Sequence, residues 1–269
     1  MTERGDGTPR GDHVQLLPAE RLQRIRELLG RQGSVRVATL SRELGVSEVT
    51  IRSDLSQLEQ EGFARRTHGG AVLARGTRYE RPFAEQEARF REEKRRIGQA
   101  AARLVEDGDT IILDVGTTTT EVARHLPAGL TDVVVITSSL NIALELEKYP
   151  YVTVLVTGGT LRSLQHSLVN PYGTLLLSQV NADKLFLGCN GVSAAKGITN
   201  ANLQEAEIKR AMIAAAKQVI VVADHSKIGS VAVAHVAPLS AVDRVVTDQA
   251  ADPREVEHIR QAGVEVDLV

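Results

Sequence analysis

The chain has 269 residues, 42% of them hydrophobic and 25% charged, with a formal net charge of −2 at pH 7. This length allows either two domains or one large α/β domain. The nearly neutral charge excludes a polybasic protein that coats nucleic acid indiscriminately. A single cysteine, Cys189, excludes an intramolecular disulfide and indicates a reducing compartment.

No apolar run approaches the roughly 18 residues of a membrane helix, and the N-terminus has no hydrophobic signal segment. We therefore expect a cytoplasmic protein with no membrane partner. Charge is unevenly distributed, because residues 1–97 carry 19 Lys+Arg against 15 Asp+Glu, whereas the remainder carries 13 against 19. A basic N-terminal part followed by an acidic C-terminal part is typical of a small DNA-binding head joined to a larger domain.

The first elements predict a small helical domain, over residues 18–74, behind a disordered tail over residues 1–17. Apolar residues at helical spacing follow Pro18, and a second helix is expected over about 38–44. Ser47 can cap a third helix that runs to about residue 61. Residues 63–73 predict a two-stranded ribbon whose turn is Gly69-Gly70.

A helix, a glycine turn and a serine-capped helix form the geometry that places a second helix in the DNA major groove. Arg52 is the best candidate to bind guanine or clamp a phosphate, and basic residues flank the tip of the wing. The chain has four Tyr, four Phe and no Trp, which disfavours stacking on single strands and leaves double-stranded DNA as the expected partner. The candidate DNA-binding residues are Arg42, Ser47, Glu48, Thr50, Arg52, Ser53, Arg65, Arg66 and His68. A plain helical hairpin that happens to carry an arginine remains an alternative at this point.

A charged segment that becomes helical follows, and we assign residues 75–93 as a linker. Its aromatic residues Tyr79, Phe83 and Phe90 either form an interface between heads or domains, or anchor a solvated linker.

Residues 94–269 alternate helices with short, Val- and Ile-rich strands, each followed by a small polar loop. This pattern predicts a mostly parallel sheet covered on both faces, an α/β fold. The expected strands are 110–114, 133–137, 152–157, 185–188, 219–223 and 244–247, and the clearest helices are 139–148 and 203–217.

The loop from Asp114 to Glu121 follows a strand and opens a helix, and its hydroxyls and free N–H groups suit a phosphate. It is neither a Walker loop nor a dinucleotide fingerprint, and a simple threonine-rich cap is equally compatible with it. Since loops after parallel strands meet at one sheet edge, we expect one anion pocket there. Its candidate residues are Asp114, Gly116, Thr117, Thr118, Thr119, Ser138, Asn141, Gly158, Gly159, Arg162, Asn190, Gly191, Lys209, Asp224 and Lys227. No catalytic residue, metal site or cofactor is expected.

The chain resembles the DeoR family of bacterial regulators across most of its length. The resemblance rests on the segments Val46–Arg52, Leu58–Gly62 and Arg66–Ala71, which match the family's helix-turn-helix and its Arg-x-His-Gly-Gly-Ala wing. Ser53 departs from the family, which commonly has a second arginine at that position. The resemblance implies a winged helix-turn-helix followed by a sensor domain similar to ribose-5-phosphate isomerase, which responds to phosphorylated sugars.

In that resemblance, Asp224–Lys227 looks like the isomerase's Asp-x-Ser-Lys element, and Ile208-Lys209 stands at its Glu-Lys pair. The carboxylates that move a proton would be replaced, with none beside Lys209, so the resemblance implies a sensor that is not an enzyme. The stretches Asn170–Gly173 and Asn202–Ala206 look most like members that regulate the use of amino sugars.

We therefore expect a homo-oligomeric repressor of a sugar-catabolic operon that binds double-stranded operator DNA and is released by a phosphorylated sugar. A sugar-phosphate isomerase or deaminase with a DNA-binding appendage is a second hypothesis. A regulator that dimerises without any ligand is a third.

Overall fold

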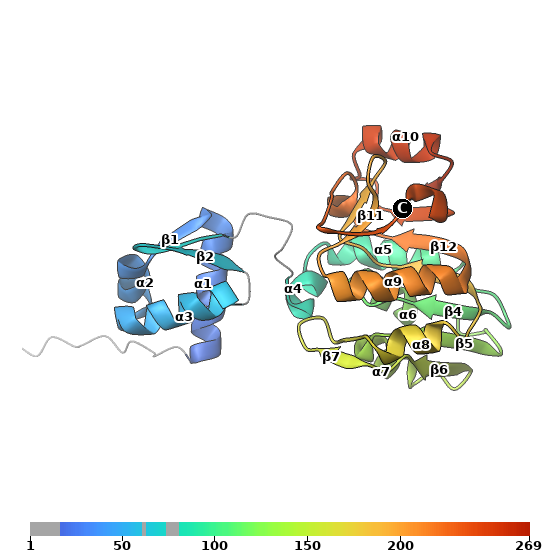
Figure 1. Cartoon of the computed structure of the whole chain (residues 1–269), viewed down its shortest axis with the longest axis horizontal. Helices are drawn as coiled ribbons and strands as arrows, with labels where there is room; N and C mark the ends of the chain where they lie inside the picture. The colour runs from blue at the N-terminus through green and yellow to red at the C-terminus, as the bar shows by residue number, and fades with distance from the viewer. Residues whose placement is uncertain (1–16, 61–62, 74–80) are drawn as a thin grey trace, which may run out of the picture. The chain divides into compact units, whose positions relative to one another are not determined.

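The computed structural model describes residues 17–60, 63–73 and 81–269, which fall into two compact units with a boundary at Tyr79 and Glu80 (Figure 1). The expected disordered tail lies outside the described residues apart from Leu17, and so do Tyr79 and the first part of the linker. None of the described helices is long and apolar enough to cross a membrane.

The N-terminal unit is a three-helix domain with a small antiparallel sheet in the order β1-β3-β2. Its elements are α1 (Pro18–Gln32), β1 (Ser34–Arg36), α2 (Val37–Leu44), α3 (Glu48–Gln60), β2 (Ala64–Thr67) and β3 (Gly70–Leu73). Gly45 ends α2 in the left-handed conformation that glycine adopts most readily (φ 66°). The expected winged helix-turn-helix is therefore present.

One buried ion pair ties the first helix to the third in this unit. The guanidinium of Arg21 donates to both carboxylate oxygens of Asp54, at 2.6 and 3.1 Å, and both residues are buried. The apolar core around the pair includes Ile25, Leu40 and Leu55. Because helix α3 is held by this bidentate contact as well as by the core, its exposed face has a defined orientation within the unit.

The wing differs from the expected ribbon in two respects. It has three strands, because β1 pairs with β3, and its turn is at His68-Gly69 rather than Gly69-Gly70. Gly70 is already part of β3, where an added Cβ would lie 1.9 Å from the carbonyl oxygen of Val35. This glycine serves the close approach of β1 to β3, a requirement that a hairpin pattern does not reveal.

The C-terminal unit is built on a seven-stranded sheet in the order β15-β14-β12-β9-β4-β5-β6, in which every pairing is parallel. The strands of this sheet are β4 (Thr110–Leu113), β5 (Val133–Thr137), β6 (Val152–Val156), β9 (Ala182–Leu187), β12 (Ala216–Val222), β14 (Arg244–Thr247) and β15 (Glu265–Leu268). Six of them correspond to expected strands, and β15 was missed because Glu265 and Asp267 interrupt its apolar pattern.

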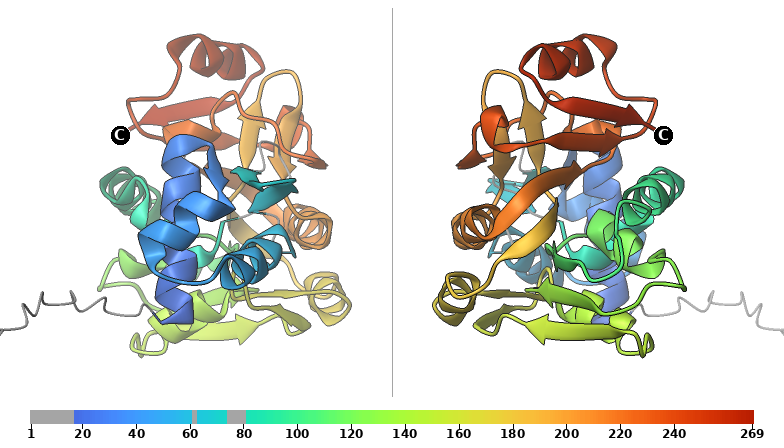
Figure 2. Two further views of the ribbon diagram at one scale, coloured as in Figure 1. Left: turned by 90° about the vertical axis from the view of Figure 1, so that its left-hand side faces the viewer. Right: turned by 90° about the vertical axis from the view of Figure 1, so that its right-hand side faces the viewer.

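Helices cover both faces of this sheet, as expected (Figures 1 and 2). The helices α5 (Arg91–Ala102), α6 (Thr117–Arg124) and α7 (Leu140–Leu146) pack on one face. The helices α8 (Tyr172–Leu177), α9 (Leu203–Ala215) and α10 (Pro253–Gln261) pack on the other. The expected helix over 203–217 ends two residues early, because β12 begins at Ala216.

The C-terminal unit also contains shorter elements that the sequence pattern did not predict. They are α4 (Phe83–Ala88), β7 (Thr160–Arg162), β8 (Ser167–Val169), β10 (Gly191–Ser193), β11 (Gly197–Asn200), β13 (Ala234–Ala237) and the 3-10 turns η1 (His225–Lys227) and η2 (Leu239–Ala241). Of the linker aromatics, Phe83 stacks on His166 and Phe90 contacts the edge of His225, both within this unit.

Candidate functional site

The exposed start of α3 carries most of the expected DNA contacts. The hydroxyl of Ser47 accepts from the backbone N–H of Thr50 at 3.1 Å, so it caps the helix as expected. Arg52 is exposed and donates to Glu48 one turn earlier, at 2.7 Å. Arg42 and Ser53 are exposed as well. This face of α3 therefore presents its side chains to solvent, and the carboxylate of Glu48 partly neutralises the charge of Arg52.

The wing contributes three further basic side chains, which are all exposed. Arg66 is held on the flank of α3, since its guanidinium donates to Ser56 at 3.0 Å and its backbone N–H donates to Glu59 at 2.9 Å. Arg65 and His68 lie on the strand and in the turn of the hairpin. Helix and wing thus place cations on adjacent elements, which is the arrangement that contacts DNA phosphates on either side of a groove.

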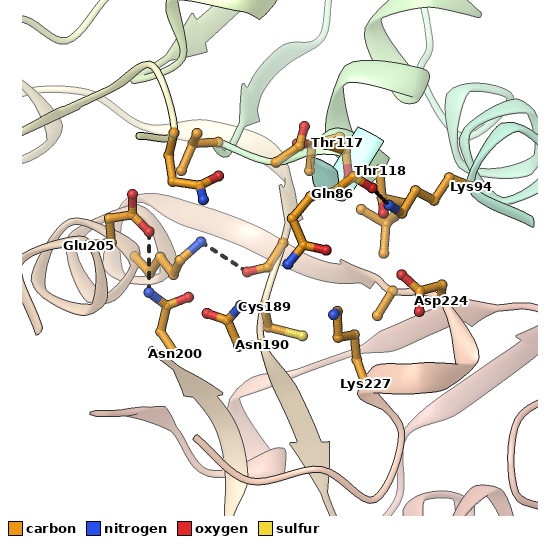
Figure 3. Close-up of a pocket in the computed structure, with 18 residues that line it drawn as sticks. Gln86, Lys94, Thr117, Thr118, Cys189, Asn190, Asn200, Glu205, Asp224 and Lys227 are labelled. Carbon is orange, nitrogen blue, oxygen red and sulfur yellow. Dashed lines mark hydrogen bonds between the residues drawn. The ribbon is translucent and has the colours of Figure 1, made fainter. Parts of the chain in front are cut away.

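A pocket opens in the C-terminal unit where the strand order reverses. From β4 the chain moves outward through β5 and β6, and it then returns to β9 on the other side of β4. The loops that follow β4, β9 and β12 line the pocket, which is partly open to solvent (Figure 3). This crevice is the usual ligand site of a parallel α/β sheet.

One side of the pocket is cationic. Lys94 of α5 is only 3% exposed, and its ammonium donates to the backbone carbonyl of Gln86 in α4. Burial lowers the pKa of Lys94 to about 8, and the nearby Lys227 adds to this effect, whereas Asp224 opposes it. In Figure 3, Lys94 lies near Thr118, and Asp224 and Lys227 lie on this same side of the pocket.

The first turn of α6 borders the same side. The hydroxyls of Thr119 and Thr120 both donate to the carbonyl of Gly116, at 2.9 and 2.7 Å. The backbone N–H groups of residues 117–119 have no partners within the helix, whereas that of Thr120 donates to Gly116 at 3.0 Å, and the helix dipole attracts negative charge. A phosphate would find N–H donors and a buried ammonium together here.

The other side of the pocket is a hydrogen-bonded polar wall. Glu205 of α9 pairs with Arg162 and also accepts from Ser167 at 2.7 Å and Asn200 at 3.3 Å. The amides of Gln86, Gln165 and Asn190 complete the lining. Figure 3 shows Glu205 and Asn200 across the cavity from Lys94 and Lys227, with Gln86 between them. Amides that can both donate and accept suit the hydroxyl groups of a polyol.

The expectation that no carboxylate stands beside Lys209 is wrong. The Lys209 ammonium pairs with Asp114 and donates to the carbonyl of Gly188 at 3.0 Å. Burial opposes the charge on Lys209, but the carboxylates of Asp114 and Glu205 outweigh it and raise its pKa. Both partners are almost fully buried, so this lysine holds β4 and β9 together and its charge is already matched.

Only part of the expected anion site lines the pocket: Gly116, Thr117, Thr118, Thr119, Asn190, Lys209, Asp224 and Lys227. Three other expected residues are not in the pocket lining. Asp114 pairs with Lys209, Arg162 pairs with Glu205, and Ser138 borders a small adjoining void. Asn141 pairs with His166 instead, at 3.0 Å. Gly158 lies beside Tyr172, and Gly159 and Gly191 pack so closely that an added Cβ would meet backbone oxygens at 2.0 and 2.2 Å.

The residues that the sequence pattern missed are Gln86, Lys94, Gln165, Asn200 and Glu205. Lys94 directly follows the charged segment assigned as the linker, so its surroundings in the sequence predict a solvated side chain, and only the packing of α5 against the sheet buries it. Glu205 follows Asn202, which caps α9, so it reads as a first-turn acidic residue. Cys189 also lines the pocket, and burial raises the pKa of its thiol to about 12, which disfavours the nucleophilic thiolate.

Comparison with known proteins matches both units in order. Residues 21–77 match the family described as "DeoR-like helix-turn-helix domain", and residues 89–249 match "DeoR C terminal sensor domain". The regulator GlpR of Haloferax volcanii is 39% identical over 251 residues, covering 93% of this chain and 98% of GlpR. The transcriptional repressor GlcR of Bacillus subtilis is 35% identical over 247 residues, covering 92% of this chain and 95% of GlcR.

Among solved structures, ribose 5-phosphate isomerase A from Methanocaldococcus jannaschii is a remote match, with 19% identity and a TM-score of 0.38 over 51% of this chain and 54% of the isomerase. The two family matches and the full-length relatives decide the assignment. The chain belongs to the DeoR family and is a DNA-binding transcriptional regulator with a C-terminal sensor domain, not an enzyme.

Proposed function

We propose that this protein represses a sugar-catabolic operon and that a phosphorylated sugar in the sensor pocket releases it from operator DNA. The observation that carries the proposal is Lys94, a buried ammonium beside the open first turn of α6. Among the residues that the structure describes, no carboxylate forms an ion pair with Lys94, and a buried charge without such a partner is costly unless a bound anion compensates it. The repressor GlcR, a relative over nearly the whole chain, supports the direction of regulation.

In this proposal the phosphate lies between the α6 N-terminus and Lys94, with Lys227 nearby. The sugar hydroxyls face Gln86 and Asn190, and beyond them the wall formed by Glu205. The two sides of the pocket therefore select for a molecule that is anionic at one end and polyhydroxylated at the other. A plain sugar lacks the first feature, and inorganic phosphate lacks the second.

The segment that enters the sensor unit supplies a route for release. The side-chain amide of Gln165 donates to the carbonyl of Arg81 at 2.6 Å, and Lys94 donates to the carbonyl of Gln86. Both donors line the pocket. A phosphate that binds the Lys94 ammonium competes with the carbonyl of Gln86 for it and so weakens a contact that holds α4 in place. In the chain, α4 follows the linker from the head. Ligand binding would thus shift the population away from the arrangement that binds DNA.

The test is a thermal melt of the full-length protein with a panel of hexose, pentose and amino-sugar phosphates and their unphosphorylated parents. A phosphorylated member should raise Tm, whereas its parent sugar should not, since a bound ligand stabilises the folded state. The same compound should weaken operator binding. The Tm of Lys94→Met should not rise when this compound is added. The Tm of Lys196→Met should rise as in the wild type, because Lys196 is exposed and outside the pocket.

If no phosphorylated sugar changes Tm or operator affinity, the effector proposal is refuted, and regulation by dimerisation without a ligand becomes the better account.

A further inference from the structure

Exposed apolar side chains gather along the β6 edge of the sensor sheet. Leu155 and Val156 of this edge strand are 40% and 42% exposed. Neighbouring elements add side chains that are more than half exposed. Figure 2 shows β6 and α8 at one end of the unit and β15 and α10 at the other in both views. We define the β6 surface as Leu144, Leu155, Val156, Leu161, Tyr172 and Leu175.

This surface contrasts with the opposite edge of the same sheet. Residues 149–161 and 167–182, which include most of the β6 surface, contain no Asp, Glu, Lys or Arg in a chain that is 25% charged. The other edge strand, β15, carries Glu265 and Asp267, and both pair with Arg244. Sheet edges that face water are normally protected by charges, prolines or a covering element. The β15 edge carries such charges, whereas β6 and the residues next to it in the chain, 149–161, carry none.

We propose that the β6 surface is the contact between two copies of this chain, related by a two-fold axis. A neutral apolar surface is complemented in charge by another neutral surface, and a two-fold axis places the same surface on both sides. The unpaired edge of β6 would gain backbone partners from the equivalent strand.

Residues 1–16 are a poor alternative occupant, because they carry Glu3, Arg4, Asp6, Arg10 and Asp12. The proposal also draws on the proposed function in one respect, since a single small head offers few phosphate contacts and two copies are needed for useful operator affinity.

The experiment measures the mass of the full-length protein by sedimentation velocity at micromolar concentration, without DNA or sugar. The wild type should be a dimer or a larger even assembly. Leu155→Lys should halve that mass, because the lysine places a charge in the centre of the contact. Leu268→Lys is the matched control, since Leu268 is on the opposite edge strand and is 41% exposed, and it should keep the wild-type mass.

A monomeric wild type overturns the proposal, and so does a Leu155→Lys protein that keeps the full mass or a control that loses it equally. If Leu155→Lys does not melt cooperatively, Leu175→Lys on α8 takes its place, since Leu175 is 62% exposed. The effector proposal is judged separately by the thermal shift, which a dissociated but folded variant should retain.

Discussion

Arg52 is the side chain on which sequence-specific DNA binding is expected to depend most. It is exposed on α3, and Glu48 holds its guanidinium at 2.7 Å until DNA competes for it. Replacing Arg52 with Ala should weaken operator binding by about 1–3 kcal/mol, or about 5–150-fold, if the side chain reads a base. Fluorescence anisotropy with a labelled operator duplex measures this loss.

Arg24→Ala provides the control for Arg52→Ala, because Arg24 is also exposed and paired with a nearby glutamate, Glu27, but lies on α1. Its operator affinity should match the wild type. Equal operator affinities for the wild type and Arg52→Ala would show that Arg52 does not contact a base.

The titration of Lys94 should be visible in the pH dependence of effector binding. Burial lowers its pKa to about 8, and a bound phosphate favours the charged ammonium. The sugar phosphate should therefore bind most tightly below pH 8 and progressively less tightly as the pH rises through 8. Isothermal titration calorimetry between pH 7 and 9.5 avoids the second ionisation of phosphate, near pH 6, which would also change affinity.

Lys94→Met provides the complementary measurement. This variant should bind weakly at every pH in that range, yet its ligand-free form should unfold at about the wild-type temperature or higher, because burying a charge opposes folding. A wild-type affinity that is the same at pH 7 and pH 9.5 would contradict the role given to Lys94.

The residues of the pocket were predictable to the extent that they follow strands in the sequence. Thr117–Thr119, Asn190, Asp224 and Lys227 stand directly after β4, β9 and β12, so the rule for parallel sheets brings them together. Lys94 and Gln86 come from helices, where no such rule applies. The sequence predicts Lys209 as a pocket residue, but its partner Asp114 is 95 residues away and only the fold reveals the pair.

Helix α4 is the element that joins the pocket to the segment leading from the head. Phe83 is 7% exposed, its ring stacks on His166, and its N–H donates to the carbonyl of Leu164 at 3.0 Å. Phe83→Ala should loosen α4 while leaving Lys94 and the α6 terminus in place. The variant should still bind the sugar phosphate, but the ligand should change its operator affinity less than it does in the wild type.

Thermal shift and anisotropy with and without the ligand separate these two effects. Leu177→Ala is the control, because it removes a buried apolar side chain of the same unit at a site on α8. Each substitution should cost about 2–5 kcal/mol of stability, yet only Phe83→Ala should reduce the ligand's effect on DNA binding. A full ligand response in Phe83→Ala would exclude α4 as the route.

Elements with a strong local pattern were predictable, and those that depend on distant partners were not. The Val-rich strand β5 and the serine-capped α3 are specified by their own residues. The strand β15 carries alternating charges and is a strand because it pairs with β14. The wing turn was displaced by one residue because Gly70 is required against β1, which is distant in the sequence.

At the scale of the whole molecule, the number of heads on the operator determines how binding responds to salt. Each phosphate neutralised by a protein cation releases condensed counterions, and the logarithm of the binding constant falls by about 0.9 per phosphate for each tenfold rise in salt. If the β6 surface joins two copies, both heads contact the duplex. The wild type should then show about twice the salt slope of Leu155→Lys, in addition to tighter binding.

Anisotropy titrations from 50 to 300 mM KCl with one operator duplex measure both slopes. Leu268→Lys should reproduce the wild-type slope, since its substitution adds the same charge to the opposite edge of the sheet. Equal slopes for the wild type and a folded, dissociated Leu155→Lys would mean that one head carries all the phosphate contacts. Dimerisation through the β6 surface would then contribute to the function of the sensor unit and not to the affinity for DNA.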